Sequence, residues 1–274
     1  MKGVSFGQYY PSDSILHKLD PRTKVIMAVF YIVCTFVCKS AAGFLALTLS
    51  ALALVFISRI PLRTILRSIR PLLFIIAFTS LMNIFFTQGE RRLTPESWVI
   101  SIYVEGLWSA LFMTLRIMIL IVGTSLFLTY TTTPIALTDA LENLLGPLKK
   151  IRVPVHDFAM MMTIALRFIP TLSDETEKIM NAQKARGSDL SSGSLLKKAK
   201  ALVPILIPLF VSAINRAFEL AAAMECRCYH GGEGRTRLKV LRYRTRDWVA
   251  MLTILVFFAG IFALRYVPWL YIMG

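Results

Sequence analysis

The run LWSALFMTLRIMILIVGTSLFL occupies residues 107–128 and contains a single charged residue, Arg116. A helix needs about 20 mostly apolar residues to cross the hydrocarbon core of a bilayer. The run therefore predicts a membrane-spanning helix. Because a charge at mid-depth in lipid is costly, we expect Arg116 to face protein or a lateral cavity, paired with an acidic group of another subunit or reaching toward the membrane surface.

Four further apolar runs are candidate spans, some of them after extension at their ends. They are Val25–Cys38, Ala41–Ser58, Pro71–Phe86 and Trp248–Leu264. Of the 274 residues, 56% are apolar and only 17% are charged, which is more apolar surface than one soluble core can bury. This composition excludes a disordered chain and disfavours a cytosolic enzyme. We expect an all-α integral membrane protein with about five transmembrane helices.

The distribution of basic residues orients these spans. The net charge is +15, and Lys and Arg gather before the first run, between the second and third runs, and in residues 130–246. Since cytoplasmic loops are enriched in Lys and Arg, we expect a cytoplasmic N-terminus, an external loop at 88–105 and a cytoplasmic segment at 130–246. In so apolar a chain, the positive charge favours a membrane over nucleic acid as the partner.

The orientation divides the chain into three predicted regions. Residues 1–129 form a membrane part with four spans, residues 130–246 a cytoplasmic region, and residues 247–274 carry the last span. Within the first region, arginines at positions 59, 63, 67 and 70 lie beside apolar residues at helical spacing. This pattern predicts an amphipathic helix along the membrane surface over 59–70.

The cytoplasmic region contains two apolar patches, Val155–Ile169 and Ala201–Ile214. We interpret both as helices that lie along the membrane or pack against other helices, with additional membrane crossings as the alternative. Pro204 and Pro208 predict a break or a kink in the second patch. The polar stretches 188–194 and 230–234 are loops by composition.

Two stretches of this region resemble each other at their ends. Each ends in Arg between two small residues, with Ala four positions before the Arg. The positions concerned are Ala182, Ala185, Arg186 and Gly187 in the first stretch, and Ala223, Cys226, Arg227 and Cys228 in the second. A guanidinium at a helix end suits a carboxylate in a partner's groove. The alternative is that both arginines are solvated helix ends.

Signatures of enzymes are missing from the sequence. It contains no Gly-Lys dipeptide and hence no phosphate-binding P-loop, and neither a GxSxG nor an HExxH motif. Its four Cys and three His show no zinc-site spacing. We therefore expect no catalytic residues, no cofactor and no metal site in this chain.

Several strings nonetheless occur together in a recognisable order. They are GQYYPSDS at 7–14, HKLDPRTK at 17–24, LRFIP at 166–170, AQKARG at 182–187 and ELAAAMECR at 219–227. In this respect the chain resembles the transmembrane T components (EcfT) of energy-coupling factor transporters, ABC-type importers of vitamins and metal ions in bacterial cell membranes. The resemblance is closer to the branch that shares interchangeable substrate-binding partners than to the dedicated biotin or cobalt systems.

The resemblance implies partners and site residues. Family members pair with two cytoplasmic ATPases, which bind the ATP, and with a membrane S component, which captures substrate. Two Ala-Arg-Gly-type motifs on their cytoplasmic coupling helices dock on the ATPases, and here these correspond to Ala185–Gly187 and Cys226–Cys228. The second motif departs from the pattern, because Cys228 replaces the glycine that would end the helix.

Two other function classes are weighed against this one. A stand-alone secondary transporter is disfavoured because the predicted spans contain no Asp or Glu and are odd in number. A membrane enzyme would have to use His17, Asp20 or His156, which form no constellation of base and nucleophile. We expect Asp20 to cap a helix that begins with Pro21, and both histidines to pack at the membrane interface.

Overall fold

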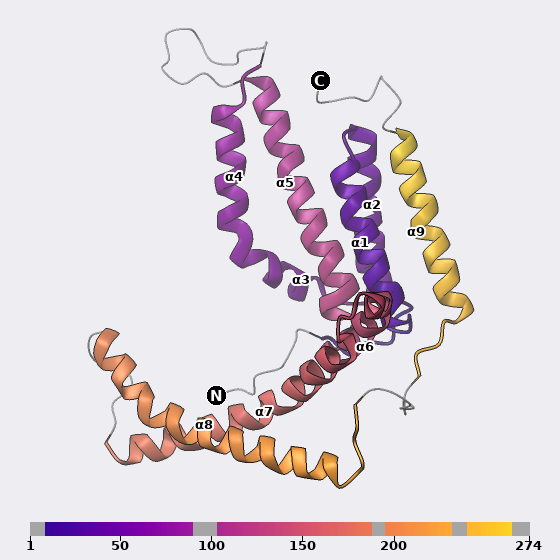
Figure 1. Ribbon diagram of the computed structural model, residues 1–274. Helices are drawn as coiled ribbons and strands as arrows, with labels where there is room; N and C mark the ends of the chain where they lie inside the picture. Colours follow the sequence, from indigo (N-terminus) through magenta and orange to yellow (C-terminus); the bar gives the residue numbers. More distant parts are fainter. Residues whose placement is uncertain (1–8, 90–102, 188–194, 232–239, 265–274) are drawn as a thin grey trace. The chain divides into compact units, whose positions relative to one another are not determined.

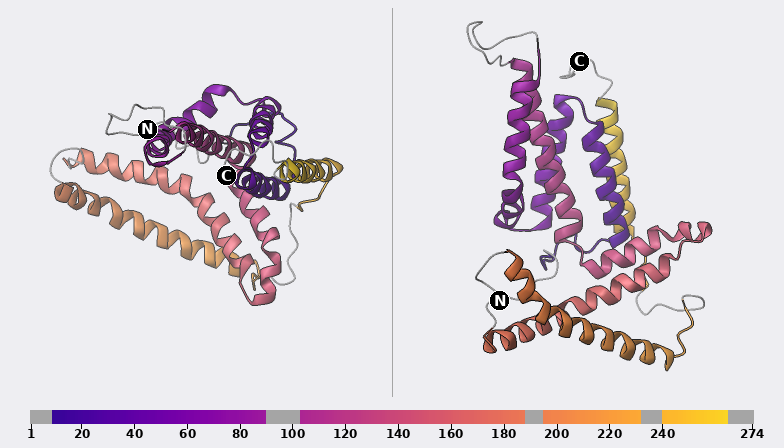
Figure 2. Two further views of the ribbon diagram at one scale, coloured as in Figure 1. Left: turned by 90° about the horizontal axis from the view of Figure 1, so that it is seen from above. Right: turned by 60° about the vertical axis from the view of Figure 1, so that its left-hand side comes forward.

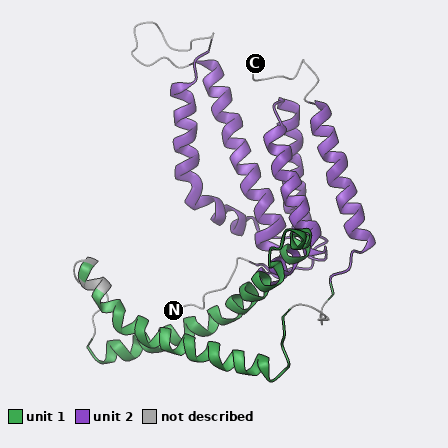
Figure 3. Cartoon of the chain, in the orientation of Figure 1, with its two compact units in different colours: residues 1–6, 141–240 green, residues 7–140, 241–274 purple. Residues whose placement is uncertain are grey.

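The computed structural model describes residues 9–89, 103–187, 195–231 and 240–264. Its regular structure is α-helical with short 3-10 and π segments, and no β-strand occurs among the described residues. Contacts divide the chain into two compact units (Figure 3). Residues 7–140 and 241–274 form the bundle unit, and residues 141–240 belong to the long-helix unit. The fold is therefore all-α, as predicted.

Most helices of the bundle unit are long and apolar (Figure 1). They are α1 (Pro21–Val37), α2 (Ala41–Ser58), the short α3 (Leu62–Ile69), α4 (Leu73–Phe86), α5 (Val104–Thr124) and α9 (Thr245–Leu264). A 3-10 turn at Arg70–Leu72 joins α3 to α4, and a π segment at Ser125–Tyr130 extends α5. Helix α6 (Pro134–Leu144) runs across the boundary between the two units.

Local sequence signals start the first two helices. The Asp20 carboxylate accepts a hydrogen bond from the N–H of Arg22 at 2.9 Å, and Pro21 is the first helical residue. This confirms the predicted cap. The Ser40 hydroxyl accepts from the N–H of Gly43 at 3.2 Å in the same way, so two donors that a helix start leaves free are satisfied.

Helices α1, α2, α5 and α9 build the main core of the bundle unit. Tyr31 of α1 and Phe127 of the π segment are both buried and meet edge to face, with ring centroids 5.8 Å apart. Gly123 of α5 lies directly against the Tyr31 ring, because a Cβ added there would come within 2.1 Å of the ring. A glycine is therefore what lets α5 approach α1 this closely.

By length and composition, five helical stretches among the described residues could cross a membrane. They are Ala41–Ser58, Leu62–Phe86, Val104–Tyr130, Lys200–Glu225 and Thr245–Leu264. The set predicted from the sequence differs in one member: it contains Val25–Cys38, which belongs largely to α1, and lacks Lys200–Glu225. With 17 residues, α1 is about 25 Å long and shorter than the roughly 30 Å hydrocarbon core, since Cys38 leaves helical geometry. The 201–214 patch lies within the fourth stretch, Lys200–Glu225, which is long and apolar enough for the alternative membrane crossing.

The predicted surface helix at 59–70 is shorter in the structure. Arg59 ends α2 in the left-handed region with φ 55°, so α3 begins only at Leu62. Ile65 and Ile69 are buried, whereas the neighbouring Arg67 is exposed. The amphipathic division predicted for this stretch is thus confirmed for the residues of α3.

Two helices of 31 residues each dominate the long-helix unit. A 3-10 segment at Gly146–Ile151 precedes α7 (Val155–Ala185), and α8 (Leu195–Glu225) follows it. Both views of Figure 2 show α7 and α8 crossing side by side. Of the break or kink predicted at Pro204 and Pro208, the break does not occur, because α8 continues through both prolines as α7 continues through Pro170.

Candidate functional site

The first arginine motif forms the C-terminal end of α7. Arg186 is the residue that caps the helix, and its N–H donates to the carbonyls of Ala182 and Gln183, each at 3.2 Å. Gly187 follows with φ 83°, a conformation that glycine adopts without strain, and its N–H donates to the Lys184 carbonyl at 3.0 Å. The small residue after the arginine therefore turns the chain away from the helix axis.

The second motif ends α8 with the same geometry. Cys228 has φ 55°, and its N–H donates to the Glu225 carbonyl at 2.9 Å. The N–H of Tyr229 donates to the Met224 carbonyl at 3.1 Å, which completes a Schellman motif with Arg227 at the cap position. The helix break that the missing glycine put in question is thus present, with a cysteine in the left-handed position.

The predicted motif residues are all open to solvent in this chain. Ala182, Ala185, Arg186 and Gly187 are exposed, and so are Ala223, Cys226, Arg227 and Cys228. The structure brings these residues together only within each motif, since the C-terminal ends of α7 and α8 lie at opposite ends of the helix pair (Figures 1 and 2). The long-helix unit therefore offers two separate, similar arginine ends.

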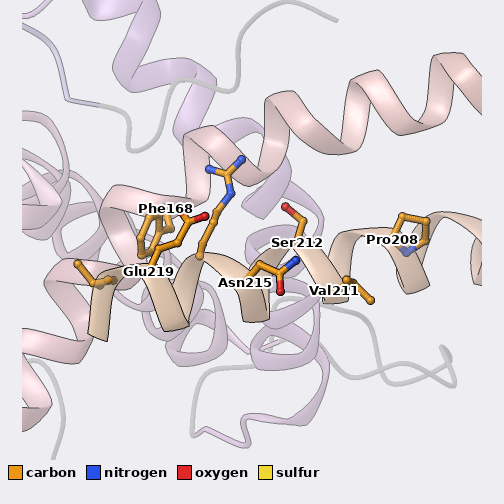
Figure 4. Close-up of a pocket in the computed structure, with 8 residues that line it drawn as sticks. Phe168, Pro208, Val211, Ser212, Asn215 and Glu219 are labelled. Carbon is orange, nitrogen blue, oxygen red and sulfur yellow. The ribbon is translucent and has the colours of Figure 1, made fainter. Parts of the chain in front are cut away.

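Between these ends, α7 and α8 enclose two grooves. The larger, about 830 Å³, is lined by Phe168 of α7 and residues 208–220 of α8, and Figure 4 shows Ser212 projecting toward α7. The smaller, about 280 Å³, is lined on the α8 side mainly by an apolar stripe at helical spacing. That stripe is Ala213, Ala217, Leu220, Ala221 and Met224, facing Ile164, Phe168 and Leu172 of α7. The stripe therefore lies on the side of α8 that faces α7, with Ala217 and Ala221 exposed in this chain.

Polar residues that sequence reasoning missed lie at this crossing. The Glu175 carboxylate accepts from the Ser212 hydroxyl at 2.5 Å and from the Arg216 guanidinium at 2.7 Å. The Gln183 side-chain amide donates to the Pro204 carbonyl at 3.4 Å. No local pattern links residues 41 positions apart, and only the acidic character of α7 opposite a lone arginine on α8 could have suggested the ion pair.

Arg116 lies on α5 and reaches the end of the first helix. Its guanidinium donates to the Cys38 carbonyl at 3.2 Å and stands over the Phe44 ring, 5.3 Å from the centroid. The carbonyls at a helix C-terminus lack partners within the helix, so a cation there is favourable. The Arg116 Nε is buried without a hydrogen-bond partner among the described residues.

In the second N-terminal string, residues 17–24, Asp20 and Lys24 are buried and hydrogen-bonded. The Lys24 ammonium donates to the Thr131 carbonyl at 2.7 Å and to the His17 carbonyl at 3.3 Å. The N–H of Asp20 donates to the Asp247 carboxylate at 2.8 Å, which ties the start of α1 to α9. This string therefore holds the bundle helices together.

His17 packs in the same region, as expected for a structural histidine. Its Nε2 lies 2.9 Å from the Tyr10 carbonyl, so that nitrogen carries the proton, and Nδ1 accepts from the Ser14 hydroxyl at 2.7 Å. Burial lowers the pKa of His17 below its ordinary value, and the nearby Lys24 charge acts in the same direction. Both ring nitrogens are thus engaged in hydrogen bonds within the bundle unit.

His156 is engaged elsewhere, at the start of α7. Its Nδ1 lies 2.9 Å from the Glu142 carboxylate of α6, within the long-helix unit. In the described part of the chain, no group of three or more His, Cys, Asp or Glu side chains could hold a metal ion. The histidines and Asp20 are accounted for by helix capping and packing contacts.

Comparison with known proteins identifies relatives along nearly the whole chain. A family model described as cobalt transport protein (CbiQ) matches residues 12–238. A protein of Ruminiclostridium cellulolyticum named energy-coupling factor transporter transmembrane protein EcfT is 50% identical over 268 residues, which cover 97% of this chain and 99% of that relative. Proteins with the same name from Clostridium kluyveri and Bacillus subtilis are 51% identical over 93% and 43% identical over 97% of this chain, covering 94% and 99% of their own lengths. The chain therefore belongs to the CbiQ family and, within it, to the EcfT transmembrane components of energy-coupling factor transporters.

Proposed function

We propose that this chain is the coupling subunit of a vitamin or micronutrient importer. It passes ATP-driven motion from two cytoplasmic ATPase subunits to a membrane S component that captures the substrate. The observation that carries the proposal is the pair of matching, exposed arginine ends on α7 and α8. Two equivalent contacts at separate places suit two ATPase subunits better than one.

Each arginine end is suited to enter a groove lined by carboxylates. The exposed Ala182 and Ala223 lie one turn before Arg186 and Arg227 and allow the helix end to approach a partner closely. Hydrolysis of ATP belongs to the partner subunits in this proposal, so the coupling chain itself is no enzyme and needs no cofactor. The strings near the N-terminus resemble the branch that serves several interchangeable S components.

We place α7 and α8 on the cytoplasmic side, with the N-terminus. The Lys and Arg distribution supports this orientation. Although α8 is apolar enough to cross a membrane, its Arg216 is paired with Glu175 on α7, a helix rich in charge. Two such helices packed along each other are better accommodated at the membrane surface than across it.

The proposal is tested by replacing the two arginines in the assembled transporter. Losing one partner of a buried interfacial charge pair costs about 2–5 kcal/mol. Arg186→Ala or Arg227→Ala alone should weaken one ATPase contact and reduce ATP-dependent uptake, while the second contact keeps the complex together. The double variant should lose both ATPases on purification and yet still bind the S component.

Lys178→Ala is the matched control, since Lys178 is an exposed cation on α7 outside the motif. It should leave ATPase co-purification and uptake unchanged. If the double arginine variant assembles and transports like the wild type, both arginines are solvated helix ends and the proposed docking is wrong.

A further inference from the structure

Two polar links join α7 to α8 away from the arginine ends. In the first link, each carboxylate oxygen of Glu175 has its own partner: Oε1 accepts from Ser212 at 2.5 Å and Oε2 from Arg216 at 2.7 Å. The side chains of Glu175 and Arg216 are 24% and 34% exposed, so the pair is half-buried at the crossing. Short, charge-assisted hydrogen bonds of this kind hold a defined geometry.

The second link uses a carbonyl that a proline sets free. In an α-helix the Pro204 carbonyl would accept from the N–H four residues later, but that residue is Pro208, which has none. The Gln183 amide of α7 donates to this carbonyl at 3.4 Å instead. Gln183 thereby ties the turn before Arg186 to the neighbouring helix.

The two links share one register. From Glu175 to Gln183 the chain advances eight positions along α7, and from Ser212 to Pro204 it goes back eight positions along α8. The helices therefore run antiparallel, and each link confirms the alignment that the other requires. A slip of either helix by one residue would break both.

The same register sets where the arginines stand. Arg186 follows Glu175 by eleven positions, and Arg227 follows Arg216 by eleven positions. At 1.5 Å per residue, each arginine end lies about 16 Å beyond the ion pair, in opposite directions. The Glu175–Arg216 pair therefore marks the midpoint between the two ends.

We propose that Glu175 and Gln183 are positioning residues that lock the register of α7 and α8 and so fix the spacing between the two arginine ends. This inference rests on the proposed function, because the spacing matters only if both ends engage ATPases at once. Neither residue need touch an ATPase or the substrate. Their loss should leave assembly intact and lower the amount of substrate imported per ATP hydrolysed.

The first experiment compares Glu175→Gln with Asp174→Asn in the complete transporter reconstituted in vesicles. Asp174 is an exposed carboxylate on the same helix, so its loss changes the charge equally without touching the link. Glu175→Gln should lower uptake per ATP hydrolysed by about threefold, the scale of a half-exposed ion pair. Asp174→Asn should not change it. The charge exchange Glu175→Arg with Arg216→Glu should recover at least part of the loss.

The second experiment tests the proline-freed carbonyl. Gln183→Leu should lower uptake per ATP in the wild-type background. In a Pro208→Ala background the residue at 208 supplies its own N–H to the Pro204 carbonyl, so the same Gln183→Leu change should have little further effect. Equal effects of Gln183→Leu in both backgrounds would overturn this link.

The register itself is measured by the distance between spin labels in the purified complex. Labels at Lys178→Cys on α7 and Ala222→Cys on α8 occupy exposed positions, after the exposed native thiols are removed by Cys226→Ala and Cys228→Gly. We expect one narrow distance distribution that Glu175→Gln broadens. If ATPases fail to co-purify with the wild-type chain, the proposed function fails. If they co-purify but Glu175→Gln changes neither the distribution nor the uptake ratio, only the register lock is wrong.

Discussion

Single side chains determine how the helices of the bundle unit meet. Asp247 is buried, and its two carboxylate oxygens accept from the N–H groups of Asp20 and Arg244, each at 2.8 Å. One carboxylate therefore satisfies N–H groups at the starts of both α1 and α9, which find no backbone acceptor within their own helices. Residues far apart in the chain are thus joined at one end of the bundle by a single acid.

Gly123 gives a steric prediction at the same scale. A methyl group at this position would overlap the Tyr31 ring, so Gly123→Ala should destabilise the bundle unit by about 1–3 kcal/mol despite the better helix propensity of alanine. Gly260→Ala on α9 is the control, because an added Cβ there meets nothing within 4 Å. Thermal unfolding midpoints in detergent should fall for Gly123→Ala alone.

His17 gives a prediction for pH. Its pKa in the folded chain lies below the ordinary 6.5, because burial disfavours the charged ring. The unfolded chain therefore binds a proton more readily than the folded one once the pH falls below about 6.5. The contribution of His17 to the free energy of unfolding is therefore fully present above about pH 6.5 and is lost as the pH falls below that value. The unfolding temperature should therefore decrease as the pH falls below about 6.5.

The control for this effect is His17→Gln. This variant retains a polar side chain but has no titratable ring, so the part of the pH dependence due to His17 should disappear. An unfolding temperature with the same pH dependence in both proteins would show that other groups are responsible.

At the scale of helices, hydropathy predicts which helices exist better than it predicts the residues at which they begin and end. The start of α2 at Ala41 and the end of α9 at Leu264 both follow directly from the apolar runs. The continuity of α8 could not be predicted, because Pro204 and Pro208 signal a break or a kink locally, while Gln183, whose amide donates to the freed Pro204 carbonyl, is distant in sequence. Glu175 escaped notice for the same reason: its role depends on tertiary contacts.

The end of α8 carries a prediction about cysteine in place of glycine. Cys228 adopts φ 55°, which costs an ordinary side chain about 1 kcal/mol and a β-branched one more. Cys228→Gly should therefore bind the ATPase as well as or better than the wild type, and Cys228→Val should bind it more weakly. Co-purification of the ATPase at graded detergent stringency provides the comparison.

Cys226→Val serves as the control, since Cys226 does not have a positive φ. It should resemble the wild type in ATPase binding. Equal weakening by the two valine substitutions would mean that side-chain size, and not backbone conformation, governs this contact.

For the whole molecule, the orientation in the membrane is the main expectation still to be measured. Native Cys226 and Cys228 are exposed in the chain, whereas Cys34 and Cys38 are buried. In intact cells, a membrane-impermeant maleimide should leave the native protein unlabelled and should label a Gln88→Cys variant from outside. After permeabilisation, the native cysteines should react as well. Labelling of Cys226 or Cys228 in sealed cells would reverse the proposed orientation.

The equal arms of the α7–α8 pair have a mechanical consequence. A stiff rod held at its centre moves its two tips by the same amount in opposite senses. Eleven residues separate the Glu175–Arg216 pair from each arginine end, so the two arms have equal length. If both ends engage ATPases as proposed, the two subunits would act on this chain through arms of equal length.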